Sequence, residues 1–186
     1  MRPILSVFFL EFVCVLAFAQ DDSSKDLRVV PAVDVQRYCG TWYEIARLPN
    51  SFQKQCVGDV TATYTLDNDE FIVVNRCRKE NGEIAEAVGR ARRASSDGPY
   101  TKLKVRFAPA ILSFLPFVWG NYWIIDLADD YGYAVVGEPK REYLWILSRT
   151  RTLPDATVHQ IMERLVQQGY DLKDLKFTVQ GDEKSN

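Results

Sequence analysis

Alternation of apolar and polar residues organises the chain from residue 41 to residue 149. Short runs of β-branched and aromatic residues are separated by turn-forming pairs such as Pro49-Asn50 and Asp129-Asp130. The pattern predicts eight β-strands, over residues 41–48, 57–66, 71–77, 85–93, 103–107, 122–127, 133–136 and 143–149. Closure removes exposed sheet edges, so eight sequential strands favour an all-β fold, a closed antiparallel up-and-down barrel.

The apolar period changes after residue 153. Pro154 suits the first position of a helix, and Gly169 suits the position after its end. Between them the apolar residues recur at the spacing of one helical face, at Val158, Ile161, Met162, Leu165 and Val166. We therefore expect one C-terminal amphipathic helix packed on the outside of the barrel, followed by a short strand over 177–179.

The N-terminus precedes this pattern and has the features of an export signal. A mostly apolar stretch, Ile4–Phe18, follows Arg2, and Ala17 and Ala19 are small residues of the kind that a signal peptidase recognises. Lipoprotein anchoring through Cys14 is the alternative. The expected organisation is a signal peptide over 1–19, an N-terminal segment over 20–32, one domain over 33–180 and a disordered tail over 181–186. The mature protein would be periplasmic, associated with an outer membrane, or secreted.

Exported proteins can keep disulfides, so we examine which cysteines could form one. Cys56 and Cys77 lie at the open ends of a predicted hairpin, and strand parity places both on the same apolar face. A Cys56–Cys77 disulfide is therefore expected. Cys39 is left over, and we interpret it as a buried small hydrophobic residue beside Gly40 and not as a reactive nucleophile, because no base is adjacent to it.

Composition and charge narrow the chemistry. Of 186 residues, 47% are hydrophobic and 12% aromatic, whereas 23 Lys and Arg against 25 Asp and Glu give a net charge of −2. No excess of positive charge exists to bind nucleic acid. His159 is the one histidine of the sequence, so a metal site with several histidine ligands is excluded. A histidine-dependent catalytic triad would have His159 as its single candidate base. We expect no catalytic residues, no metal and no cofactor.

Three motifs in order resemble those of the lipocalin family. They are Gly40-Thr41-Trp42-Tyr43-Glu44, Asp130-Tyr131 with Tyr133-Ala134-Val135-Val136, and Tyr143-Leu144-Trp145-Ile146-Leu147-Ser148-Arg149-Thr150. Within the family the chain is most similar to bacterial lipocalins, plant temperature-induced lipocalins and apolipoprotein D. The resemblance implies that Trp42 fills the closed end of the barrel and that Arg149 stacks on its indole, as a planar guanidinium can.

Strand parity and the resemblance together predict the lining of a ligand pocket. Parity with Trp42, with Arg149 or with the cysteine pair places eight residues on inward faces: Glu44, Ala46, Ala62, Tyr64, Val73, Asn75, Tyr143 and Trp145. By resemblance, Tyr122, Ile124 and Val136 also face inward. Such a lining, aromatic and aliphatic with a few polar groups, suits an amphiphile, although the same residues could instead fill a solid barrel.

One segment between two predicted strands carries no charge. Residues 108–118 include two prolines and five large apolar residues, namely Ile111, Leu112, Phe114, Leu115 and Phe117. This apolar segment could cover the barrel mouth, insert into a membrane interface or form a homodimer contact. We favour a combination of the first two, because the resemblance implies an entrance and membrane role at this place.

These expectations favour an exported carrier over an enzyme. The protein would bury a fatty acid, a lysophospholipid or a similar hydrophobic ligand for lipid storage, transport or membrane maintenance under stress. One alternative is a lipocalin-type isomerase, which would need an unpaired inward thiol, and only Cys39 could supply it. Another is a secreted scavenging or inhibitory module. Partners would be a small lipid ligand and a membrane surface, and no nucleic acid.

Overall fold

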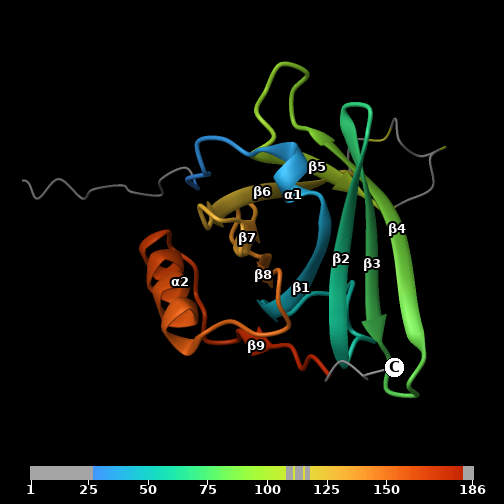
Figure 1. Ribbon diagram of the computed structural model, residues 1–186, viewed down its shortest axis with the longest axis vertical. Coiled ribbons are helices and arrows are strands. Elements are labelled where there is room, and N and C mark those ends of the chain that lie inside the picture. The colour runs from blue at the N-terminus through green and yellow to red at the C-terminus, as the bar shows by residue number, and fades with distance from the viewer. Residues whose placement is uncertain (1–26, 108–110, 112–114, 116–117, 182–186) are drawn as a thin grey trace, which may run out of the picture.

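Eight antiparallel strands of the chain close into a barrel. The computed structural model describes residues 27–107, 111, 115 and 118–181. Its elements are α1 (Val35–Tyr38), β1 (Gly40–Arg47), β2 (Gly58–Asp67), β3 (Glu70–Arg78), β4 (Ile84–Arg93), β5 (Lys102–Arg106), β6 (Gly120–Leu127), β7 (Tyr133–Gly137), β8 (Leu144–Ser148), α2 (Asp155–Gln167) and β9 (Lys176–Phe177). Consecutive strands pair from β2 to β8, and β1 pairs with both β8 and β2 (Figure 1). The predicted fold class is confirmed.

Small differences from the expected elements have local causes. The segment before Gly40, which reads as a turn, is the short helix α1, because the Asp34 carboxylate accepts hydrogen bonds from the backbone N–H groups of Gln36 and Arg37. Pro154 is the N-cap of α2 and not its first residue. Within the described residues no helix has the length and apolar character needed to span a bilayer.

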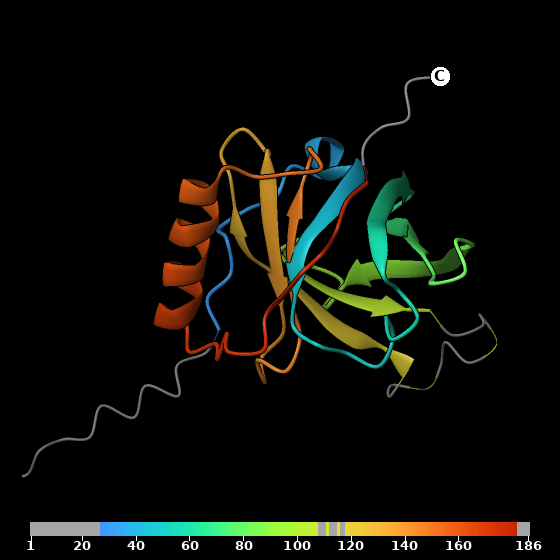
Figure 2. The same cartoon turned by 90° about the horizontal axis from the view of Figure 1, so that it is seen from below.

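Two apolar clusters separate the inside of the barrel from its helix-covered outside. The inner cluster takes side chains from all eight barrel strands, including Trp42, Tyr64, Phe71, Ala91, Leu103, Tyr122, Val136 and Leu147. The outer cluster joins Ile161 and Leu165 of α2 to residues of β1, β6, β7 and β8. Figure 2 shows α2 lying along one side of the barrel. The amphipathic stripe of the helix therefore covers the wall and leaves the interior to other residues.

A β-bulge in β1 changes which of its side chains face inward. The bulge lies between Glu44 and Ala46 in the pairing with β8. Trp42 belongs to the inner cluster, Ala46 belongs to the outer one, and the Arg47 side chain turns back to Glu44. The expectation that Ala46 faces the interior is wrong, because an extra residue shifts the strict alternation on which parity depends.

The C-terminal segment 176–181 fills the space where β1 and β2 diverge. The Thr178 N–H donates to the Ile45 carbonyl at 2.9 Å, and the Asp59 N–H donates to the Val179 carbonyl at 2.9 Å. The amide of Gln180 donates to the carbonyls of Glu44 and Val60 at 2.8 and 2.9 Å. The segment thus bridges two barrel strands and brings Thr178 beside Glu44.

Candidate functional site

Trp42 and Arg149 form the closed end of the barrel. Trp42 is fully buried, and its indole N–H donates to the Tyr38 carbonyl at 2.9 Å. The Arg149 guanidinium carbon lies 3.6 Å from the centroid of the Trp42 ring. Its nitrogens donate to the carbonyls of Arg37, Tyr38, Cys39 and Thr41. Arg149 therefore ties the end of α1 to the start of β1 while it stacks on the indole.

Three buried tyrosines continue inward from Trp42. The hydroxyl of Tyr122 is 2.8 Å from that of Tyr38 and 2.8 Å from that of Tyr64. Burial raises the pKa of Tyr64 to about 12, and it raises the pKa values of Tyr38 and Tyr122 well above their ordinary value. All three hydroxyls are therefore neutral near pH 7. The three hydroxyl groups carry three protons and form two hydrogen bonds with one another. One O–H group can therefore donate to a further acceptor.

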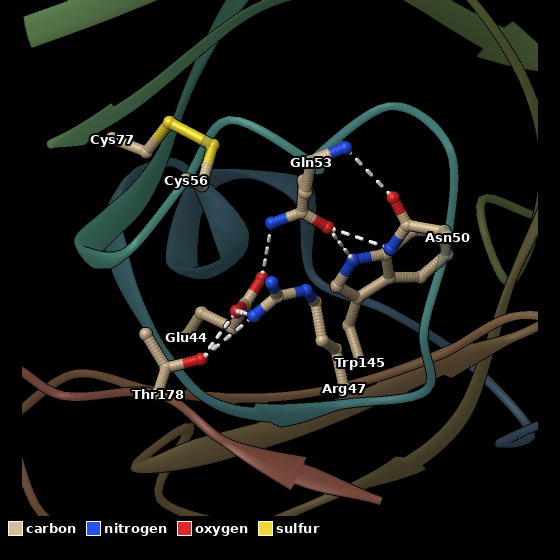
Figure 3. Close-up of a disulfide and its surroundings, with 8 residues drawn as sticks. All are labelled: Glu44, Arg47, Asn50, Gln53, Cys56, Cys77, Trp145 and Thr178. Atoms are coloured by element: carbon tan, nitrogen blue, oxygen red, sulfur yellow. Dashed lines mark hydrogen bonds and ion pairs between the residues drawn. A yellow bond between two sulfur atoms is a disulfide. The ribbon is translucent and has the colours of Figure 1, made fainter. Parts of the chain in front are cut away.

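The opposite end of the interior contains a buried ion pair and its hydrogen-bond partners. Glu44 is 2% exposed, and its carboxylate accepts from Arg47 Nη1 at 2.9 Å and from Gln53 Nε2 at 2.6 Å. Thr178 Oγ1 also donates to Glu44. The Trp145 indole N–H donates to Gln53 Oε1 at 2.9 Å. Figure 3 shows these side chains converging inside the ring of strands, below the loop that joins β1 to β2.

Several buried atoms have no hydrogen-bond partner among the described residues. Two of them are Arg47 Nε of β1, a donor, and Asn75 Oδ1 of β3, an acceptor. Asn75 lies on β3 between Val73, an inner-cluster residue, and the disulfide-bonded Cys77. A buried unsatisfied polar atom costs about 1–3 kcal/mol. A polar group of a ligand, or water, could satisfy both atoms.

The expected disulfide fastens the same end of the barrel. Cys56 and Cys77 are bonded, with their Cα atoms 5.5 Å apart. The bond joins the loop between β1 and β2 to the end of β3, close to the Glu44 network (Figure 3). Cys39, the free cysteine of the described residues, is half-buried and packs against the inner cluster at the closed end.

The structure brings most of the expected lining residues together. Members of the inner cluster, or residues packed against it, are Ala62, Tyr64, Val73, Tyr122, Ile124, Val136 and Trp145. Tyr143 lies just before β8, where its ring stacks on Trp145 with a centroid distance of 6.0 Å and also contacts Phe52. Of the eleven expected lining residues, only Ala46 lies outside the interior or its rim.

Sequence reasoning missed several residues of the interior. Tyr38 comes from α1 and not from a strand, and Arg47 turns inward only because of the bulge. Gln53 and Thr178 come from a loop and from the C-terminal segment, for which strand parity gives no orientation. Phe71 shares parity with Val73, and Leu147 shares parity with Trp145, so the same alternation could have identified these two.

Large apolar side chains are exposed around the open end of the barrel. Phe52, Ile84, Val88 and Ile111 are each more than half exposed. Ile111 and the half-buried Leu115 belong to the expected apolar segment, whereas Leu112, Phe114 and Phe117 lie outside the described residues. Exposed apolar residues grouped at one end are typical of a contact surface.

A closed eight-stranded barrel with a stacked Trp–Arg pair at one end and an apolar interior agrees with one family. The family model described as a lipocalin-like domain matches residues 33–180. The chain belongs to the lipocalin family.

Relatives of this lipocalin come from plants, bacteria and animals, as the resemblance predicts. It is 42% identical to temperature-induced lipocalin-1 of Arabidopsis thaliana, with 85% of each chain covered. It is 34% identical to the outer membrane lipoprotein Blc of Citrobacter freundii, with 96% of each covered. Apolipoprotein D of Mus musculus is 32% identical over 79% of this chain and 77% of the relative.

Membership of the lipocalin family and the apolar interior support binding of a small hydrophobic ligand. None of the three relatives has the name of an enzyme. The disulfide is a feature of proteins that fold outside the reducing cytoplasm.

Proposed function

We propose that this lipocalin is an exported carrier that buries the acyl chain of a fatty acid or lysophospholipid in its barrel. The inner cluster supports this proposal most directly, because aromatic and aliphatic side chains from all eight strands converge on one interior. Each buried methylene contributes about 0.8 kcal/mol, so about ten of them contribute about 8 kcal/mol. That free energy is of the order needed for micromolar binding, from which the costs of association are subtracted.

The polar groups of the interior suggest how the ligand is oriented. Asn75 Oδ1 and Arg47 Nε are among the buried atoms that have no partner among the described residues, and both belong to the half that contains the Glu44 network. Arg47 is already paired with Glu44, so the pair has no net charge to offer. We infer that a hydroxyl, ester or zwitterionic head group lies near these atoms and that the acyl chain extends toward Tyr64 and Tyr122.

The exposed apolar residues at the open end of the barrel extend the proposal to membranes. Phe52 and Ile111 are 68% and 79% exposed at the open end. A barrel that placed this end on a bilayer could exchange lipid without exposing the acyl chain to water. Lipid exchange of this kind would serve membrane maintenance under stress, as the temperature-induced and outer-membrane names of its relatives suggest.

Neighbouring residues of β2 provide a matched test of burial inside the barrel. Ala62 packs against the inner cluster, whereas Thr61 lies next to it on the opposite face of the strand. Ala62→Phe should weaken binding of a fluorescent fatty acid about tenfold or more, since the ring occupies the space of several methylenes. Thr61→Phe should change it less than about twofold, and near-ultraviolet circular dichroism reports whether each variant is folded.

Native mass spectrometry of the purified protein gives an independent readout. Co-purified lipid, lost in Ala62→Phe and kept in Thr61→Phe, is the expected result. An empty barrel that binds no fatty acid, or equal effects of the two substitutions, would contradict the proposal.

A further inference from the structure

Basic side chains gather on the outer wall formed by β4, β5 and β6. Leu103 and Val105 of β5 face the inner cluster, so the alternating residues Lys102 and Lys104 face outward, whereas Arg106 on the same side is only 7% exposed and lies against Trp119. On β4, Ala91 faces inward and its neighbours Arg90 and Arg92 face outward. Strand pairing then sets Arg92 opposite Lys104 and Arg90 opposite Arg106. The four accessible residues Arg90, Arg92, Lys102 and Lys104 are called the basic wall below.

Such a wall is unfavourable for the isolated protein. Like charges directly opposite each other on neighbouring antiparallel strands destabilise the sheet. Two indoles from β6 and its preceding loop offset part of this cost. The Arg92 guanidinium lies 4.1 Å from the Trp119 ring centroid, and the Lys102 ammonium lies 4.2 Å from that of Trp123.

Acidic residues neutralise only part of the basic wall. Arg90 pairs with Asp67 at 3.0 Å and with Glu70 at 3.5 Å. Across residues 27–107 and 118–181, no ion pair involves Arg92, Lys102 or Lys104. The whole chain has a net charge of −2, so this excess of positive charge is local to one face.

A hollow of about 410 Å³ lies on the same wall. Arg92, Arg93, Lys104, Trp119, Ser95 and Ser96 line it. Two acidic residues also line it, but Glu70 faces Arg90 at 3.5 Å and Asp69 faces Arg93 at 3.8 Å. Cations, serine hydroxyls and an indole together provide the donors that an anionic phosphate group needs.

Exposed apolar residues continue the basic wall toward the open end. Val88 follows Arg90 on the outward face of β4 and is 57% exposed, and Ile84 on the same face is 58% exposed. Apolar side chains that can enter a bilayer therefore lie beside cations that can reach its phosphates. A nucleic acid would bind the cations but would leave the apolar part of this face in water.

We propose that the outer wall of β4, β5 and β6 docks this lipocalin on an anionic phospholipid membrane, with lipid phosphates bound by Arg92 and Lys104 beside Trp119. This docking adds a charged face to the membrane contact that the proposed function assigns to the exposed apolar residues at the open end. It does not depend on which ligand the barrel holds. Each basic residue near an anionic surface contributes about 1 kcal/mol, so reversing two charges should reduce membrane affinity about tenfold or more.

The test measures binding of the full, disulfide-bonded protein to vesicles. Phosphatidylcholine vesicles with phosphatidylglycerol are compared with phosphatidylcholine vesicles alone, at low and at high salt. The test variant is Arg92→Glu with Lys104→Glu. The control is Lys173→Glu with Lys176→Glu, which makes the same change in net charge at exposed positions away from the wall. Arg92→Gln with Lys104→Gln serves as a milder test if the first variant does not fold.

The wild type should bind anionic vesicles, release them at high salt and bind neutral vesicles weakly. The wall variant should lose about tenfold or more, the control less than about threefold, and both should keep wild-type fatty-acid binding. Fatty-acid binding thus separates failure of docking from failure of the carrier function. Equal binding to neutral and anionic vesicles, equal losses in the two variants, or tighter binding of an oligonucleotide than of anionic vesicles would overturn the proposal.

Discussion

The Trp42–Arg149 pair at the closed end and the Glu44 network at the open end differ in how completely their polar groups are satisfied. At the closed end the Trp42 indole, the Arg149 guanidinium and the hydroxyls of Tyr38 and Tyr122 all have hydrogen-bond partners. At the open end Arg47 Nε has none among the described residues. Apolar side chains are buried at the closed end, whereas several at the open end are exposed.

This difference separates stability from binding. The Trp42–Arg149 pair, with satisfied hydrogen bonds and close packing, contributes stability and has little to offer a ligand. Unsatisfied polar atoms and exposed apolar groups at the open end lower the stability of the free protein. A ligand or a membrane that contacts these groups can offset that cost. Non-covalent packing stabilises the closed end, whereas the disulfide between Cys56 and Cys77 stabilises the open end.

The largest expected effect tests the closed end. Trp42→Ala removes a fully buried side chain and the surface on which Arg149 stacks. The free energy of unfolding, measured in urea by circular dichroism, should fall by about 3–5 kcal/mol. Trp123→Ala on the outer wall, where the ring is partly exposed, should cost less than half as much. Equal losses at the two positions would show that the closed end has no special role in stability.

The next effect tests the open end. Cys56→Ser with Cys77→Ser opens a loop with a sequence separation of 21 residues. Loss of this constraint on the unfolded chain should lower the free energy of unfolding by about 3 kcal/mol. Cys39→Ser, which breaks no disulfide, is the control. A loss greater than that of Trp42→Ala would reverse the assignment of stability to the closed end.

A smaller effect, dependent on pH, tests the buried tyrosines. A tyrosine in the unfolded chain titrates near pH 10, whereas burial raises the pKa of Tyr64 to about 12. The native state keeps its proton where the unfolded state loses it, so the contribution is complete below pH 10 and is lost as the pH rises toward 12. For Tyr64 the loss amounts to about 3 kcal/mol. Urea midpoints measured across this range should fall less steeply in Tyr64→Phe, and identical slopes would contradict the burial effect.

Local rules predicted most of the fold and much of the site. Turn residues and alternation located all eight barrel strands, and the apolar stripe from Val158 to Leu165 located α2. Parity also identified the disulfide, because Cys56 and Cys77 lie beside paired strands with a known alternation. Ala46 was misplaced because a bulge depends on the pairing of β1 with β8, which is not a local property.

The sequence by itself determined the strands, the helix, the covalent link and the family resemblance, since each depends on residues within one element or one hairpin. Only the tertiary structure decided which polar groups meet inside the barrel and which cations share one wall. Glu44 meets Thr178, and Arg92 lies opposite Lys104, because barrel closure and strand register join distant segments. Register is a property of two strands together, so no single segment encodes it.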